Sequence, residues 1–157
     1  NYHGKGNIAS MLDVAILGAT EVDLNFNANV VSHSDGQLLH GIGGWQDALF
    51  SKCTILAVPT FRNRVPIIRD HLTPLCGPGE LVDVVVTERG IAINPRRQDL
   101  MEAVQSTDLP IRSLEELKAG AEALCGGSGR TISPNGEPVA VVTWVDGTAL
   151  DTLYKTS

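Results

Sequence analysis

The residues best suited to chemistry lie in one short run, SHSDGQLLHGIGGWQD, at positions 32–47. Within it, Gly41, Gly43 and Gly44 fall in four consecutive positions. Because glycine tolerates positive φ, such a loop can turn several backbone N–H groups toward one point. Converging N–H groups bind anions, and one donor to a developing oxyanion is worth about 3 kcal/mol. The pattern fits a glycine-rich hairpin bend equally well, and it matches neither a Walker loop nor G-x-G-x-x-G.

The side chains of the same run suggest a Ser-His-Asp triad, which geometry argues against. His33, Ser34 and Asp35 are adjacent, so their side chains point in different directions, whereas triads assemble from separated segments. We expect His33 and His40 to be hydrogen-bonding loop residues. The spacing of His and Cys matches no known structural zinc pattern, so no metal is expected.

Two further polar pairs are candidates for ligand binding. Glu88 and Arg89 end the stretch VVVTERG, and ligands of open α/β sheets sit where strands end. They form either an ion pair or a carboxylate and a guanidinium beside a ligand. Arg96 and Arg97 are expected in the first turn of a helix, where each cation costs up to about 1 kcal/mol. Acidic neighbours such as Asp99 relieve this cost, and a bound phosphate or carboxylate would relieve it further.

The composition indicates one folded domain. The chain has 157 residues, of which 43% are hydrophobic and 19% charged, so it can form a core and is not expected to be disordered. A net charge of −6 argues against a nucleic-acid surface, and no apolar run approaches the ~20 residues of a membrane span. No targeting segment is visible, and the missing Met suggests a piece of something longer. Three widely spaced cysteines predict a reduced, cytoplasmic chain.

Hydrophobic patterning predicts the elements that position these residues. Residues 11–20 form a near-continuous apolar run, which predicts a strand buried on both faces. Residues 21–31 alternate, which predicts a strand whose polar face carries three asparagines that must find hydrogen-bond partners. Further strands are expected at 53–60, 80–88 and within GIAINP.

Helical signals and a hairpin follow. Asn94 and Pro95 predict a helix start, while Ser113 and Glu116 predict a capping box for a helix that ends at Gly126. We expect a domain over 1–125, a Gly/Ser/Pro linker over 126–138, and a β-hairpin over 139–157 with a type I′ turn at Asp146-Gly147. The predicted fold class is α/β, with a mixed sheet and flanking helices.

Four stretches of the sequence together resemble a known family. They are EVDLNFNANV, SDG, GIGGWQDA and VDVVVTERGIAINPRRQDL. They look like the C-terminal half of the citrate lyase α subunit, in the citrate CoA-transferase branch of the CoA-transferases. The resemblance covers roughly residues 10–125 and the terminal DGT hairpin. It implies a fold of the CoA-transferase and ribose-5-phosphate isomerase type. It also implies an activity, the exchange of acetyl for citrate on an acyl-carrier-protein or CoA thioester, which gives citryl thioester and acetate.

The resemblance also implies partners and site residues. The partners are citrate, an acyl-carrier (γ) subunit with a phosphoribosyl-dephospho-CoA arm, a lyase (β) subunit, and the missing half of the same subunit. The resemblance assigns catalysis to Gly43, Gly44 and Glu88. It assigns binding of substrate or CoA to Asn27, Asn29, Ser34, Asp35, Gly36, Gly41, Trp45, Asp47, Arg89, Arg96 and Arg97.

Trp45 departs from the family pattern, which commonly has Gly-Gly-His at this loop. The indole could pack on the pantetheine arm or fill the core. No residue is assigned as nucleophile. The alternatives for function are another CoA-transferase, an acyl-CoA thioesterase, and a non-catalytic module that docks the carrier protein.

Overall fold

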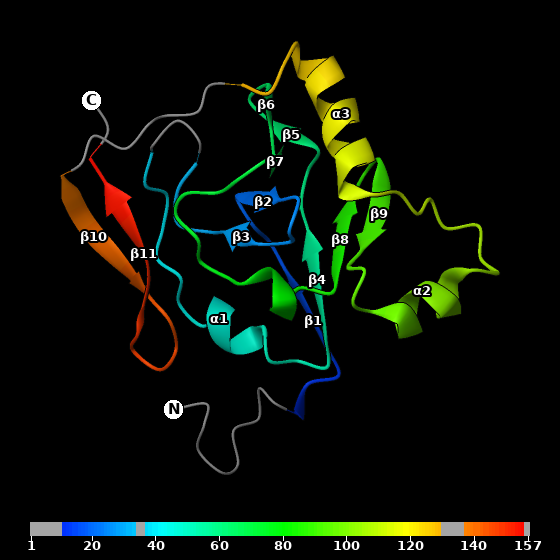
Figure 1. Ribbon diagram of the computed structural model, residues 1–157, viewed down its shortest axis with the longest axis horizontal. Helices are drawn as coiled ribbons and strands as arrows, with labels where there is room; N and C mark the ends of the chain where they lie inside the picture. Colours follow the sequence, from blue (N-terminus) through cyan, green and yellow to red (C-terminus); the bar gives the residue numbers. More distant parts are fainter. Residues whose placement is uncertain (1–10, 34–36, 130–136, 156–157) are drawn as a thin grey trace.

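The largest sheet of the described chain is four-stranded and mixed (Figure 1). The computed structural model describes residues 11–33, 37–129 and 137–155. The strand order is β1 (Val14–Leu17), β4 (Cys53–Ala57), β8 (Val84–Thr87) and β9 (Gly90–Ile93). Strands β1, β4 and β8 are parallel, and β9 is antiparallel to β8, so the predicted mixed sheet is confirmed. We call it sheet A.

A smaller sheet packs against one face of sheet A. It has the order β3 (Ala28–Asn29), β2 (Glu21–Asp23), β7 (Ile68–Arg69), with β2 antiparallel to β3 and parallel to β7. The short strands β5 (Phe61–Arg62) and β6 (Val65–Pro66) form a separate pair. The core between these layers includes the fully buried side chains of Val22, Leu56, Ile68 and Val85.

Three of the predicted strands differ from the structure in burial, continuity or start. The run 11–20 is not buried on both faces, because β1 is an edge strand whose Val14 and Ile16 are 51% and 69% exposed. The stretch 21–31 is not one strand, because a turn over 24–27 separates β2 from β3. Phe26 adopts a φ of 64° there, and the Asp23 carboxylate accepts hydrogen bonds from the turn's backbone. Predicted strand 80–88 begins later than expected, after the 3-10 turn η2 (Gly79–Leu81).

The helices are few, as predicted. The short α1 (Trp45–Ala48) follows the glycine run, and α2 (Gln98–Val104) begins later than expected. Asn94 does not cap α2, whose N-cap residue is Arg97. The Asn94 Oδ1 accepts from the backbone N–H of Arg96, before the helix, and its buried amide donates to backbone oxygens of Gly79 and Val82. Helix α3 (Leu114–Cys125) has the predicted capping box and ends at Gly126, whose φ is 85°. No helix among the described residues is long and apolar enough to cross a membrane.

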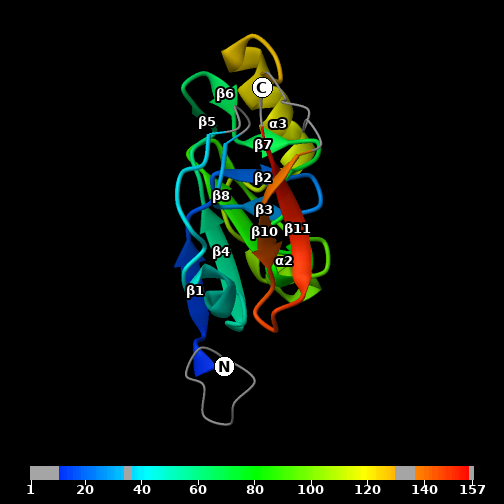
Figure 2. The same ribbon diagram turned by 90° about the vertical axis from the view of Figure 1, so that its left-hand side faces the viewer.

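The C-terminal hairpin is present as β10 (Pro138–Thr143) and β11 (Ala149–Tyr154) (Figure 2). Its turn is not type I′, because Gly147 has a positive φ and Asp146 does not. Instead the Asp146 carboxylate accepts hydrogen bonds from Thr148, which closes a longer loop. Val142 is buried in a second apolar cluster, so the hairpin packs on the domain. Most of the predicted linker lies outside the described residues.

Candidate functional site

The glycine loop is exposed while the residue at its centre is anchored. Ile42 packs against the apolar cluster that contains Val30 and Val31. Gly41, Gly43 and Gly44 are exposed on either side of it, and Gly43 has a φ of 58°. None of these three glycines donates its backbone N–H to another residue in the described parts of the chain. The loop therefore presents N–H groups that an external acceptor can use.

The next two side chains fix the loop and α1 to the rest of the protein. The Trp45 indole N–H donates to the backbone oxygen of Gly18 at 2.8 Å, just after β1. The Gln46 amide donates to the backbone oxygen of Cys76 at 2.9 Å. A Cβ atom at Gly77 would lie 2.4 Å from the Trp45 ring, so glycine is needed for the two to pack. Trp45 is half-buried and packs against both apolar clusters, and its contact with the pantetheine arm stays a prediction. Asp47 lies half-buried in the first turn of α1.

A buried polar network supports the segment that leads into the loop. Asn29 is fully buried, and its amide donates to the backbone oxygen and hydroxyl of Ser32. Its Oδ1 accepts from the backbone N–H groups of Val31 and Ser32. Asn27 donates to Asp23 and accepts from the backbone N–H of Gly79. Both asparagines therefore hold protein groups, and their contact with citrate stays a prediction.

Glu88 lies where the sequence placed it, directly after β8. Its Oε2 accepts from the backbone N–H of Thr60 at 3.0 Å. Burial alone would raise the pKa of Glu88, but hydrogen bonds from Thr60 and the nearby Arg89 charge lower it below its ordinary value. Glu88 is therefore a carboxylate at neutral pH. Gly18 and Glu88 follow the parallel strands β1 and β8. They therefore lie at the same end of sheet A, beyond the carboxyl ends of these strands, with β4 between them.

Arg96 and Arg97 lie at the opposite end of sheet A, near the start of β8. Arg97 forms ion pairs of 2.8 Å with Asp83 and with Asp99. Its hydrogen bonds to Asp99 and Asp83 raise its pKa, and the same pairing lowers the pKa of Asp99 to about 2. The salt-bridged alternative therefore holds for Arg97. Arg96 is exposed and forms no ion pair with the described residues.

The predicted residues therefore do not form one compact cluster. In Figure 1 the glycine loop lies on the α1 and hairpin side of sheet A, and α2 lies on the other side. Arg96 and Arg97 precede α2, so they are not in its first turn as predicted. Ser34, Asp35 and Gly36 lie outside the described residues. Sequence reasoning missed Ser32, Gln46 and Gly77, which support the loop through contacts distant in the chain and carry no local signal.

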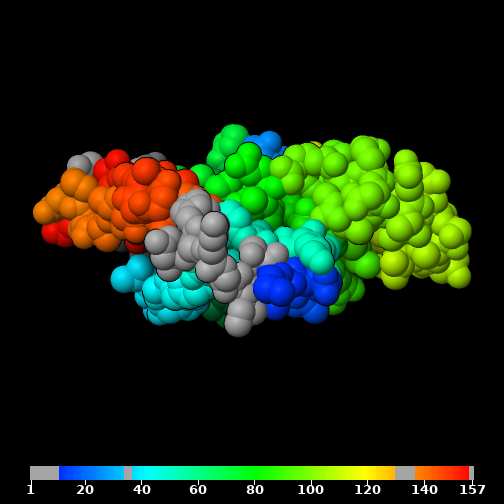
Figure 3. All heavy atoms as spheres, turned by 90° about the horizontal axis from the view of Figure 1, so that it is seen from below, coloured from blue at the N-terminus to red at the C-terminus, as the bar shows by residue number. Residues whose placement is uncertain are grey.

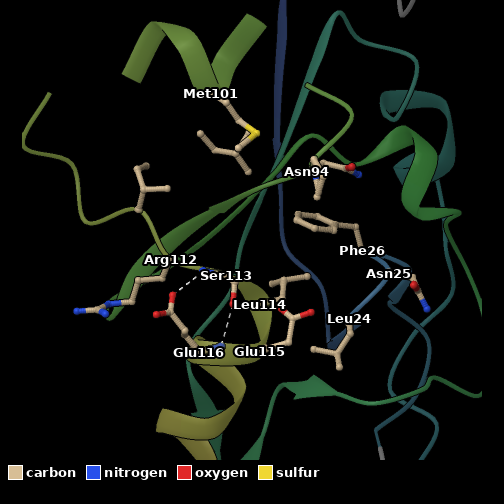
Figure 4. A pocket seen from close by; sticks show the side chains of 13 residues that line it. Leu24, Asn25, Phe26, Asn94, Met101, Arg112, Ser113, Leu114, Glu115 and Glu116 are labelled. Atoms are coloured by element: carbon tan, nitrogen blue, oxygen red, sulfur yellow. Dashed lines mark hydrogen bonds between the residues drawn. The ribbon is translucent and has the colours of Figure 1, made fainter. Parts of the chain in front are cut away.

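A cavity of about 550 Å³ lies elsewhere, beside the end of β9 (Figure 4). Leu24, Phe26, Met101 and Leu114 give it a largely apolar lining, and it contains the Ser113 capping box. None of the predicted site residues that the structure describes lines it. No group of three His, Cys, Asp or Glu side chains in the described ranges could hold a metal ion.

The family model described as "Citrate lyase, alpha subunit (CitF)" matches residues 1–156. The chain belongs to this family. It is 39% identical to the citrate lyase alpha chain of Haemophilus influenzae and 37% identical to that of Escherichia coli K12, each over 156 residues. These matches cover 99% of this chain and 31% or 30% of the relatives, so the chain spans about 30% of their length.

A solved structure agrees with the same assignment. The Streptococcus mutans protein, described as an alpha subunit of citrate lyase in complex with citrate, is 38% identical with a TM-score of 0.93. The match covers 99% of this chain and 30% of that one. The resemblance to the citrate lyase α subunit and the mixed α/β fold are therefore confirmed. The chain spans about 30% of its relatives, not the half that the sequence suggested. The closer comparison with ribose-5-phosphate isomerase stays a prediction.

Proposed function

We propose that this chain forms part of the acyl-thioester transferase subunit of citrate lyase. The subunit exchanges acetyl for citrate on a thioester of an acyl-carrier protein or CoA, which gives citryl thioester and acetate. The observation that carries the proposal is the exposed glycine loop, whose N–H groups are unused by the described chain in a member of the citrate lyase α family. The citrate complex of the S. mutans relative supports citrate as the acceptor acid.

The backbone of the loop supplies the main catalytic contribution in this proposal. The N–H groups of Gly43 and Gly44 donate to the thioester carbonyl oxygen as it gains negative charge. Donors of this kind typically contribute 10²–10³-fold in rate, provided that they are held in place before the reaction. The hydrogen bonds of Trp45 and Gln46 hold the loop in this way.

The loop also fits the CoA-type arm that the family implies. A Cβ atom at Gly41 or Gly43 would meet no atom within 4 Å, so open space surrounds this backbone. The arm, from CoA or from the phosphoribosyl-dephospho-CoA group of a carrier protein, supplies the thiol that carries the acyl group. Without side chains, the glycines let the arm approach the backbone closely.

The charged residues have supporting roles. Glu88 is a carboxylate at neutral pH, so it accepts hydrogen bonds or protons and does not donate one. Arg89 lies beside it. Arg96 is exposed at the opposite end of sheet A, so it suits a phosphate of the arm that lies away from the reacting carbonyl. We further propose that the subunit works in the cytoplasm with an acyl-carrier (γ) and a lyase (β) subunit.

The test uses a chimeric subunit, in which this chain replaces the matched segment of the H. influenzae relative. It is supplied with an acetyl thioester of CoA or carrier protein, with and without citrate. We expect acetate and citryl thioester to form only when citrate is present. Release of free thiol without citrate would instead identify a thioesterase. Carrier binding with no acetate release would identify a docking module, and either result contradicts the proposal.

A further inference from the structure

One face of sheet A is apolar and only partly covered by the described chain. Paired residues on neighbouring strands point to the same side of a sheet, so the register of β1, β4, β8 and β9 assigns each side chain to a face. One face carries Ala15, Leu56 and Val85, which are buried against the core. We call the other face the open face. Its β-branched, exposed or half-buried side chains are Val14, Ile16, Ile55, Val86, Ile91 and Ile93. Val84 lies on the same face but is buried, so the face is open mainly along β1.

The composition of the open face is that of a protein interior. No charged residue occupies any of its strand positions. Exposure is greatest on β1, at Val14 and Ile16, and Figure 3 shows the chain around β1 (blue) at the molecular surface. Parallel strands in soluble proteins are normally covered on both faces, and large apolar patches mark interaction sites. The outer edge of β1 is also unpaired with any described strand, so it can accept another strand.

The lengths of the relatives indicate what covers this face. The S. mutans structure contains this fold with a TM-score of 0.93 in 30% of a single chain, and the curated relatives show the same proportion. More than two thirds of each relative therefore lies outside the match. Permanent interfaces are more apolar than transient ones. A face without charged residues therefore fits a neighbour in the same chain better than a transient partner.

We infer that the rest of the citrate lyase α subunit packs on the open face and covers the second side of sheet A. A second copy of this chain is the competing occupant. The inference concerns packing only, so its test gives the same answer whether or not the proposed transfer reaction is correct.

Cys53 and Cys125 provide the test. Cys53 lies on the open face, and Cys125 lies at the end of α3, and both are free and half-buried. Alkylation rates are measured at each cysteine by peptide mass spectrometry, in this chain alone and in the chimeric subunit. We expect labelling of Cys53 to slow at least about tenfold in the chimera, with Cys125 changed less than about twofold. Equal labelling of Cys53 in both proteins would overturn the inference.

Matched variants separate packing from general destabilisation. In the chimera, Ile16→Asp should restore fast labelling of Cys53, whereas Val139→Asp, at a comparably exposed position on β10, should not. The same labelling is run with the remainder of the relative supplied as a separate co-expressed chain, so that the result does not depend on the fusion folding. Protection of Cys53 that rises with the concentration of this chain alone, and is unchanged by the remainder, would assign the face to a second copy and overturn the inference.

Discussion

Asn29 is expected to be the polar side chain on which the segment before the glycine loop depends most. Replacing it by Ala removes Oδ1, which accepts from the backbone N–H groups of Val31 and Ser32 at 3.0 and 3.3 Å. Both N–H groups lie in a buried region, and an unsatisfied buried group costs about 1–3 kcal/mol. The free energy of unfolding should therefore fall by about 2–6 kcal/mol. For a chain of this size, this lowers Tm by about 2–4 °C per kcal/mol.

Urea unfolding of this chain, followed by circular dichroism, measures the effect. Asn25→Ala is the matched control, because Asn25 is exposed on the neighbouring turn and its side chain bonds no described residue. The control should change the free energy of unfolding by no more than about 0.5 kcal/mol. If Asn29→Ala also stays within 0.5 kcal/mol of the wild-type chain, the network does not support this segment and the reasoning is refuted.

Three further predictions test the fold and its electrostatics. Gly79→Ala places a Cβ 1.9 Å from the Asn25 backbone oxygen, so thermal melting should show a loss of about 1–3 kcal/mol; an unchanged Tm would contradict the packing. NMR titration should show Asp99 with a pKa of about 2 that moves up toward 3.8 in Arg97→Gln. Since this pKa is lowered by folding, the pair stabilises the protein above about pH 4, and that contribution disappears as the pH falls toward 2. Ser113→Ala should cost about 1 kcal/mol in urea unfolding through loss of the α3 cap, and no change would rule the cap out as a stabilising contact.

Local signals in the sequence predicted the elements that depend on few residues. The capping box of Ser113 and Glu116 and the terminal Gly126 fix α3 by contacts within one turn of their own positions. The apolar run before Glu88 and the GIA stretch after Arg89 gave β8 and β9 for the same reason.

Elements that depend on distant contacts could not be predicted. The apolar run 11–20 predicts a buried strand, but it does not show which other elements cover that strand. Its place as an edge strand of sheet A was therefore missed. The alternation of 21–31 continues through a turn because Phe26 turns into the core with a positive φ. In the same way, the pairing of Arg97 with Asp83 separates the arginines from the glycine loop, and no spacing within NPRRQD shows it.

The central claim is that the backbone of the glycine loop stabilises the thioester oxygen. The most direct measurement is the citrate-dependent transfer rate of the chimeric subunit carrying Gly43→Val, beside Gly147→Val as a control. Both glycines have positive φ, 58° and 89°, with open space at Cβ, so valine strains each backbone similarly, but Gly147 lies in the hairpin turn. We predict that Gly43→Val lowers kcat about 10²–10³-fold and that Gly147→Val leaves it within about twofold. Equal rates in the two variants would contradict the claim.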